Sequence, residues 1–341
     1  MTKHKTIKVS MRPDLLDNLL FAFLSGDFQT RRTVCEKCNV SRVTASKVAK
    51  ALIESKIMCE KTFAQGDTAP SAHLSVDDDL SIMIIDLSSP AFSLSLVSPD
   101  TRVRIETAHT YDASLTFDDN LNVFLSRCGL KAKQSGYPYS AISVIYADEA
   151  RRGYLENIDI RATLPSIKDK IKIDESIYSV FHKHPISHLT VSQAIGEALR
   201  FGLTDGTTGN EGVSYIFIGS RISSFHIYPD GSVTVCSPQY LLTNEENALI
   251  SRWRFMSKDE LDSIFVHTAI FMSSAFSPSI ILLESDLIHP DDVTAARLTR
   301  AFAIKGILPP IVRVKDRRSQ LYLLGAIRSS VHSLAKRYVI P

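Results

Sequence analysis

Cationic and hydroxyl side chains recur between residues 30 and 55 in a spacing that suits contact with a polyanion. Arg42, Lys47 and Lys50 alternate with small apolar residues, so they face away from the apolar side if this segment is helical. Such side chains bind the phosphate oxygens and base edges of duplex DNA. The residues that we predict to contact DNA are Thr30, Arg31, Ser41, Arg42, Thr44, Ser46, Lys47 and Lys50.

Two helices joined by a tight turn are expected to position these residues. Thr30 is a plausible cap for a helix that ends at Cys38, and Ser41 is a good cap for a helix over residues 42–55. Asn39 lies between the two helices, where a tight turn often needs a positive φ. The stripe expected to face inward on the second helix is Ala45, Val48, Ala49 and Leu52. This combination is typical of a helix-turn-helix.

The flanking segments extend this pattern into a complete small domain. Apolar residues repeat at helical spacing over residues 13–24, and residues 57–63 read as a strand. The strand leads to a hairpin tip at residues 65–67, and Pro70 and Ser71 suggest a linker. We therefore predict an all-α/wing winged helix-turn-helix within a DNA-binding domain of residues 1–72.

The distribution of charge agrees with a DNA-binding N-terminus. Residues 1–66 hold twelve Lys or Arg against six Asp or Glu, a formal charge of +6. The remaining residues hold 27 basic against 31 acidic side chains, a formal charge of −4. A basic domain on a mildly acidic body suits a protein that brings only one of its parts to a polyanion.

Two clusters of potential metal ligands have a simpler interpretation. Cys35 and Cys38 form a CxxC pair with no second pair nearby, so small buried hydrophobic residues are the favoured assignment. His182, His184 and His188 have no carboxylate in a ligand spacing, and we expect loop or packing roles for them. We predict no metal and no cofactor.

Cysteine usage and hydropathy indicate where the protein works. Five cysteines are few for 341 residues and odd in number, so a disulfide framework is not expected. The N-terminus lacks the apolar core of a signal peptide, and no stretch is long and apolar enough to span a membrane. These observations predict a cytoplasmic protein without a membrane partner.

The remainder of the chain repeats one order of elements, namely strands joined by hairpins followed by helices. The first set comprises strands at 80–87, 92–97, 103–107 and 141–146, and helices at 115–128 and 191–201. The second set comprises strands at 213–218, 224–228, 232–236, 279–284 and 311–315, and helices at 244–253, 258–276, 290–303 and 321–338. The repetition predicts a duplicated α/β body.

The segment TRRTVCEKCNVSRVTASKVAKALIESKIM resembles the DNA-binding part of repressors of the ROK family. The body resembles that family in layout, with LSIMIIDLSS and VSYIFIGSRISS where the family has its two phosphate loops. The resemblance implies an α/β body with duplicated actin/hexokinase-like (ribonuclease H-like) lobes. We place the first kinase-like lobe at residues 73–205 and the second at residues 206–341.

The chain departs from the kinases of that family at the positions that carry catalysis. Their first loop is Asp-x-Gly-Gly-Thr, but only Asp86 remains in Asp86-Leu87-Ser88-Ser89-Pro90. Their second loop is Gly-rich, but residues 219–224 retain a single glycine. Glycines there let backbone amides approach phosphate. The departures imply that kinase activity is lost.

Two histidines fall where the family has functional residues. The family's catalytic Asp corresponds to a position within residues 185–190, which contain His188 but no carboxylate. His226 matches the histidine of the family's zinc site, but Cys236 stands without the partner cysteines, so a closed site is not expected. The side chains left as candidates for a small ligand are Asp86, Ser88, His188 and His226.

The sequence therefore predicts a DNA-binding transcriptional regulator without catalytic residues, similar to the ROK repressors. Its expected partners are an operator in double-stranded DNA, a sugar-like or other small effector, and further copies of itself as a homodimer or tetramer. Two alternatives stay open at this point. One is an active sugar kinase with a DNA-binding domain, and the other is a regulator whose body is a scaffold without a ligand.

Overall fold

The computed structural model places the chain in two compact units. One unit consists of residues 1–202 together with 321–341, and the other consists of residues 203–320. The ranges described are 6–24, 30–63, 71–88, 91–112, 114–147, 165–181, 184–202, 212–218, 222–229, 232–236, 243–251, 255–285, 290–308, 310–314 and 321–341.

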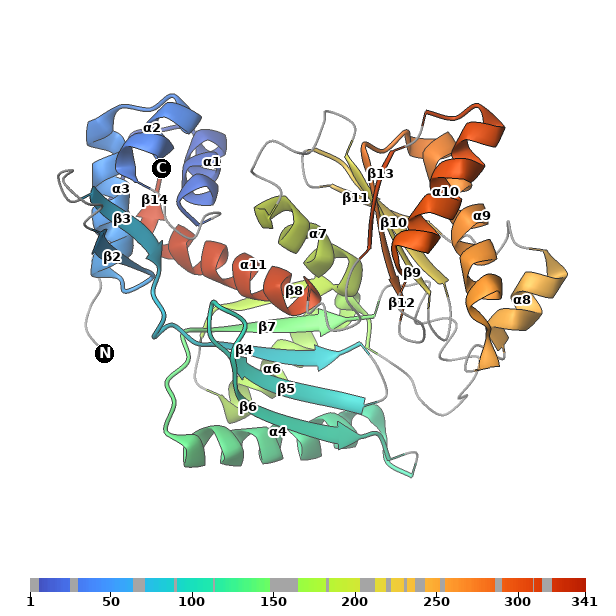
Figure 1. Ribbon diagram of the computed structural model, residues 1–341. Helices are drawn as coiled ribbons and strands as arrows, with labels where there is room; N and C mark the ends of the chain where they lie inside the picture. The colour runs from blue at the N-terminus through green and yellow to red at the C-terminus, as the bar shows by residue number, and fades with distance from the viewer. Residues whose placement is uncertain are drawn as a thin grey trace. The chain divides into compact units, whose positions relative to one another are not determined.

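Residues 6–76, here called the head, contain three helices and an antiparallel pair of strands (Figure 1). The elements are α1 (Pro13–Leu24), α2 (Arg31–Cys38), α3 (Arg42–Glu54), β2 (Met58–Phe63) and β3 (Ser71–Val76). The three helices enclose a core that includes Leu19, Phe23, Val34 and Leu52, all fully buried. The linker predicted at Ser71 is wrong, because β3 begins there and pairs with Phe63. Pro70 and the hairpin tip lie outside the described residues.

A five-stranded mixed sheet forms the first lobe, in the order β6-β5-β4-β7-β8. Its strands are β4 (Ile82–Leu87), β5 (Ala91–Val97), β6 (Val103–Thr110), β7 (Ala141–Tyr146) and β8 (Ile186–Thr190). Its helices are α4 (Phe117–Ser135), the 3-10 turn η1 (Ile167–Asp169), α6 (Lys170–Val180) and α7 (Val191–Gly202). Alternate residues of β4 face opposite cores: Met83 and Ile85 pack with α4 and α6, whereas Ile82 and Ile84 pack with the C-terminal helix.

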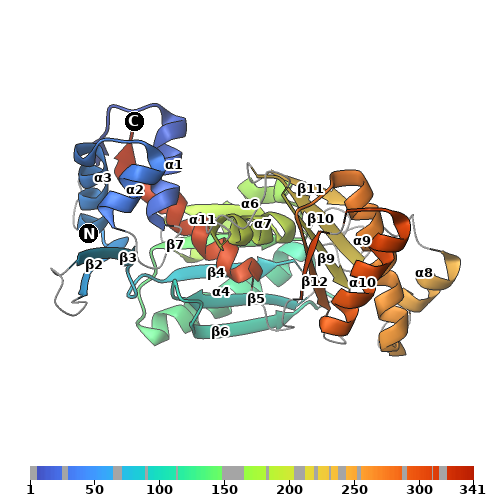
Figure 2. The ribbon, with the colours of Figure 1, turned by 45° about the horizontal axis from the view of Figure 1, so that its top comes forward.

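The C-terminal helix α11 (Leu321–Tyr338) connects the head with the first lobe (Figure 2). It packs against α7, the sheet and α1, and one continuous apolar core includes residues of all of them. Its close approach to α7 depends on Gly325, where a Cβ would lie 1.6 Å from the carbonyl oxygen of Ala194. Beyond α11, β14 (Val339–Ile340) pairs in parallel with β1 (Ile7–Lys8).

The structure therefore groups the chain differently from the boundaries drawn on the sequence. Residues 321–341, placed with the second lobe on the sequence, belong to the unit that contains the head and the first lobe. The cause is the contact of α11 with α7, which are remote in sequence. Local pattern reveals such a helix but not its packing partner.

A second five-stranded sheet, in the order β11-β10-β9-β12-β13, forms the second lobe. The strands are β9 (Val213–Ile218), β10 (Ile222–Ile227), β11 (Val233–Cys236), β12 (Ile280–Ser285) and β13 (Ile311–Val314). The helices are α8 (Asn244–Ser251), α9 (Lys258–Phe276) and α10 (Asp292–Lys305). In each lobe three strands pair antiparallel and two more add in parallel on the other side of the first strand. This shared order supports the predicted duplicated α/β body.

Candidate nucleic-acid interface

Local hydrogen bonds fix both ends of the turn between α2 and α3. The Thr33 amide donates to the side chain of Thr30 at 3.1 Å, and the Thr44 amide donates to Ser41 Oγ at 3.1 Å. Asn39 closes α2 in the left-handed region, with φ of 50°. Caps of this kind hold the start of each helix. The two caps and the positive φ predicted from the sequence are therefore present.

One face of α3 is buried and the opposite face is open. The predicted inward residues Ala45, Val48, Ala49 and Leu52 are all fully buried. Arg42, Ser46, Lys47 and Lys50 are exposed, whereas Thr44 is half-buried. Lys50 lies 3.6 Å from the carboxylate of Glu54, and within the described part of the chain Arg42 and Lys47 make no ion pair. Of the three cations on α3, these two have no ion pair within the described residues that would compete with a phosphate or a base.

Arg31 has an intramolecular partner that sequence reasoning missed. Its guanidinium donates to both carboxylate oxygens of Glu60 on β2, at 2.8 and 3.1 Å. This hydrogen bond lowers the pKa of the Glu60 carboxyl and raises that of Arg31. Thr30 is likewise occupied, since its hydroxyl lies 3.1 Å from that of Thr33. Both residues, predicted to contact DNA, are engaged in holding α2 in place.

Val43 is an exposed hydrophobic residue of α3 that sequence reasoning did not select. Its side chain is 66% exposed, although it follows Arg42 directly at the start of the helix. A signal for it was present in the helical spacing, because Val43 is not part of the buried stripe. Val43 is absent from the predicted DNA contacts because those residues were chosen for a positive charge or a hydroxyl group.

His188, a candidate contact for a small ligand in the first lobe, has a polar partner close to each of its ring nitrogens. His188 Nδ1 lies 2.9 Å from the hydroxyl of Tyr146, and Nε2 lies 3.0 Å from the carboxylate of Asp174. Burial lowers the pKa of His188, and the nearby Asp174 opposes this effect. His188 lies on β8, so the packing role expected from the sequence fits, whereas the loop role does not.

His226 is also packed into a core. It is 1% exposed, its ring stacks on Phe276 with centroids 4.8 Å apart, and its Nδ1 lies 3.1 Å from the hydroxyl of Ser214. Burial lowers its pKa. The other two ligand candidates lie at the end of β4, where the Ser88 amide donates to the Asp86 carboxylate at 2.8 Å. Asp86, Ser88 and His188 belong to one compact unit, and His226 belongs to the other.

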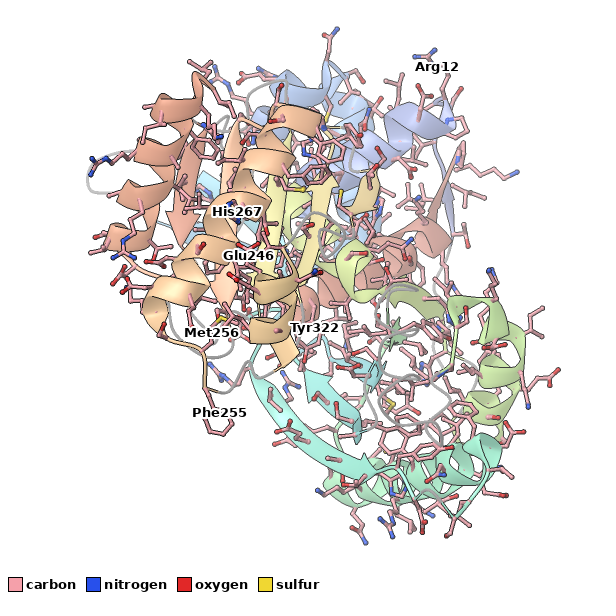
Figure 3. The ribbon with its side chains drawn as sticks, turned by 90° about the vertical axis from the view of Figure 1, so that its right-hand side faces the viewer. Arg12, Glu246, Phe255, Met256, His267 and Tyr322 are labelled. Atoms are coloured by element: carbon pink, nitrogen blue, oxygen red, sulfur yellow. The ribbon has the colours of Figure 1, made fainter. Side chains whose placement is uncertain are left out.

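Buried charges in the second lobe join its helices to one another. Asp262 on α9 is 2% exposed and accepts from Thr294 at 2.8 Å and from Arg297 at 2.9 Å, both on α10. Figure 3 shows His267 on α9 facing Glu246 on α8, with which it forms a hydrogen bond. Hydrogen bonds and opposite charges of this kind compensate the cost of burying a carboxylate. These residues have structural roles.

No group of three or more His, Cys, Asp or Glu side chains in the described ranges is placed to hold a metal ion. No helix in those ranges combines the length and apolar character needed to cross a bilayer.

The sequence matches no known family description and no curated protein. Among solved structures, the chain is similar to a ROK family transcriptional regulator that is a homolog of the E. coli MLC protein. The TM-score is 0.62 at 11% identity, and the alignment covers 94% of this chain and 98% of the regulator. This likeness shows the fold.

Two sugar kinases are also among the similar structures. A ROK hexokinase from Thermus thermophilus aligns with 74% of this chain and 98% of its own, at 14% identity and a TM-score of 0.47. A ROK family glucokinase from Streptomyces griseus, solved with glucose and AMPPNP, aligns with 73% of this chain and 99% of its own, at 12% identity and a TM-score of 0.45.

Proposed function

We propose that this chain is a sequence-specific DNA-binding transcriptional regulator of the ROK type. The head acts as a winged helix-turn-helix, in which α3 enters the major groove and the β2–β3 pair is the wing. The observation that carries the proposal is the division of α3 into a fully buried face and an exposed face, on which Arg42 and Lys47 have no ion pair with a described residue. The fold shared with a ROK family regulator supports it.

The charge of the α3 surface suits DNA. Cations without an intramolecular partner can replace the counterions condensed on the phosphates, and this replacement favours binding. The capped N-terminus of α3 adds a partial positive charge at the same end as Arg42. Within this proposal Arg31 becomes a positioning residue, because Glu60 already takes both of its terminal nitrogens.

We assign no phosphoryl transfer to the body. Both ring nitrogens of His188 have partners, so this residue is poorly placed to take a proton from a sugar hydroxyl. The proposed use of the body is to carry an effector and to join copies of the chain into a homodimer or tetramer in the cytoplasm. We propose Asp86 and Ser88 as effector-contacting residues, since ligands of α/β sheets bind near the carboxyl ends of parallel strands.

Selection of bound sequences from a random library of duplex DNA tests the proposal directly. The expected result is enrichment of one motif, present as two half-sites if the chain binds as a dimer. Binding to that motif should exceed binding to scrambled DNA by about a thousandfold or more at physiological salt. Failure to enrich any motif, with no DNA binding at low salt, would refute the proposed function.

A further inference from the structure

The exposed face of α3 includes a hydrophobic residue, Val43, near the start of the helix. Val43, Lys47 and Lys50 follow one another at spacings of four and three residues, so they line one side of the helix. This side is opposite Ala45 and Leu52, which are fully buried. Val43 is the second residue of α3 and thus lies at the end that the proposed function brings to the base edges.

Exposure of a valine does not by itself indicate a contact with DNA. Val293 occupies the same second position on α10 and is 53% exposed. The two valines differ in their surroundings. Val293 follows Asp292, and Arg297 one turn later is paired with two carboxylates of α9. Val43 follows Arg42, and Lys47 one turn later has no ion pair with a described residue. A polyanion would accept the surface around Val43 and would be repelled from the carboxylate beside Val293.

We propose that Val43 contacts the C5-methyl group of a thymine in each half-site and so helps to determine sequence preference. The thymine methyl is the apolar group that base pairs present in the major groove, and small apolar side chains recognise it. Lys47 and Arg42 flank the contact and hold the helix on the duplex through phosphates or base edges. The inference rests on the proposed function and adds a specificity-determining residue to it.

Removal of single methyl groups tests the contact. On the selected operator, each thymine is replaced in turn by deoxyuridine, which lacks only the C5-methyl group, and the Kd is measured for the wild type and Val43→Ala. At one position per half-site, the substitution should weaken binding by the wild type about fourfold. This is about the gain in affinity expected from burying one methyl group. Val43→Ala should bind the unmodified operator more weakly and show no further loss from deoxyuridine at that position.

Matched variants separate the possible results. Val293→Ala should bind both operators like the wild type. Val43→Thr retains one of the two γ-methyl groups of valine, whereas Val43→Ala retains neither, so Val43→Thr should keep part of the sensitivity to deoxyuridine. If deoxyuridine weakens binding by the same factor in Val43→Ala as in the wild type at every position, Val43 does not contact a thymine methyl group. The proposed regulator function would still stand. If the wild type binds no DNA at all, the proposed function fails and the inference fails with it.

Discussion

Arg31 on α2 and Glu60 on β2 form a two-pronged ion pair, with nitrogen to oxygen distances of 2.8 and 3.1 Å. The pair joins the helix before the turn to the first strand of the hairpin. A planar guanidinium that meets a carboxylate in this way fixes the relative orientation of the two elements. The pair therefore sets the angle between the proposed wing and α2.

Loss of either partner should affect DNA binding through this geometry. Arg31→Ala and Glu60→Gln are expected to weaken operator binding by similar factors, measured by fluorescence anisotropy. If Arg31 instead contacted a phosphate directly, Arg31→Ala alone would reduce the slope of log Kd against log salt concentration by about one. A large loss for Arg31→Ala beside a neutral Glu60→Gln would contradict the positioning role.

The same pair should contribute modestly to stability in a pH-dependent way. Both side chains are about one-third exposed, and such pairs contribute about 0.2 to 1 kcal/mol. The pKa of Glu60 is lowered by Arg31, so the contribution is present above the ordinary glutamate pKa and is lost as pH falls through the lowered value. Urea unfolding should show Glu60→Gln less stable than the wild type at pH 7, and the difference should vanish in acid.

Gly325 should be intolerant of a side chain. A Cβ there meets the backbone of Ala194 at 1.6 Å, so Gly325→Ala must push α11 away from α7. We expect a loss of about 1 to 3 kcal/mol in the free energy of unfolding, measured by urea unfolding. Gly129→Ala is the control, because a Cβ at Gly129 meets a side-chain methyl of Val180 that can move. Equal effects of the two substitutions would contradict the predicted tight crossing of α11 and α7.

His226 should make the second lobe sensitive to acid. Its pKa is lowered by burial, so the folded chain holds fewer protons than the unfolded chain, whose histidine pKa is about 6.5. Stability is therefore fully present above that pH and decreases as pH falls toward the lowered value. His226→Gln should lose stability at pH 7.5 but show a weaker decrease between pH 7 and 5, measured by urea unfolding. Parallel pH profiles for the wild type and the variant would contradict this assignment.

Much of the head could be predicted from sequence because its signals are local. The Thr30 and Ser41 caps, the positive φ of Asn39 and the buried stripe of α3 each depend on a few neighbouring residues. Strand β3 was missed although Ala72, Leu74 and Val76 alternate with polar residues, the pattern of a half-buried strand. The preceding Pro70 favours a linker there, and this signal prevailed over the alternation.

The features that could not be predicted depend on contacts between remote segments. The pairing of Arg31 with Glu60 spans 29 residues, and the packing of α11 against α7 spans more than a hundred. The sequence predicts no helix at α6, where only Ile173 and Ile177 are buried within a charged segment. The partners of His188 could not be predicted for the same reason, because Tyr146 and Asp174 come from β7 and α6.

The proposed function requires that α3 is the element that recognises DNA. The most direct measurement is the Kd of the Arg42→Ala, Lys47→Ala double variant on the selected operator, as a function of salt. Neither side chain has an intramolecular ion pair with a described residue, so folding should be unaffected in a urea titration. The control is Arg300→Ala, Lys305→Ala on α10, which removes two exposed cations from the second lobe. We predict at least a tenfold loss for the α3 variant, from contacts that are each worth about 1 to 3 kcal/mol, and no change for the control. If the folded α3 variant binds the operator as tightly as the wild type, α3 is not the recognition helix.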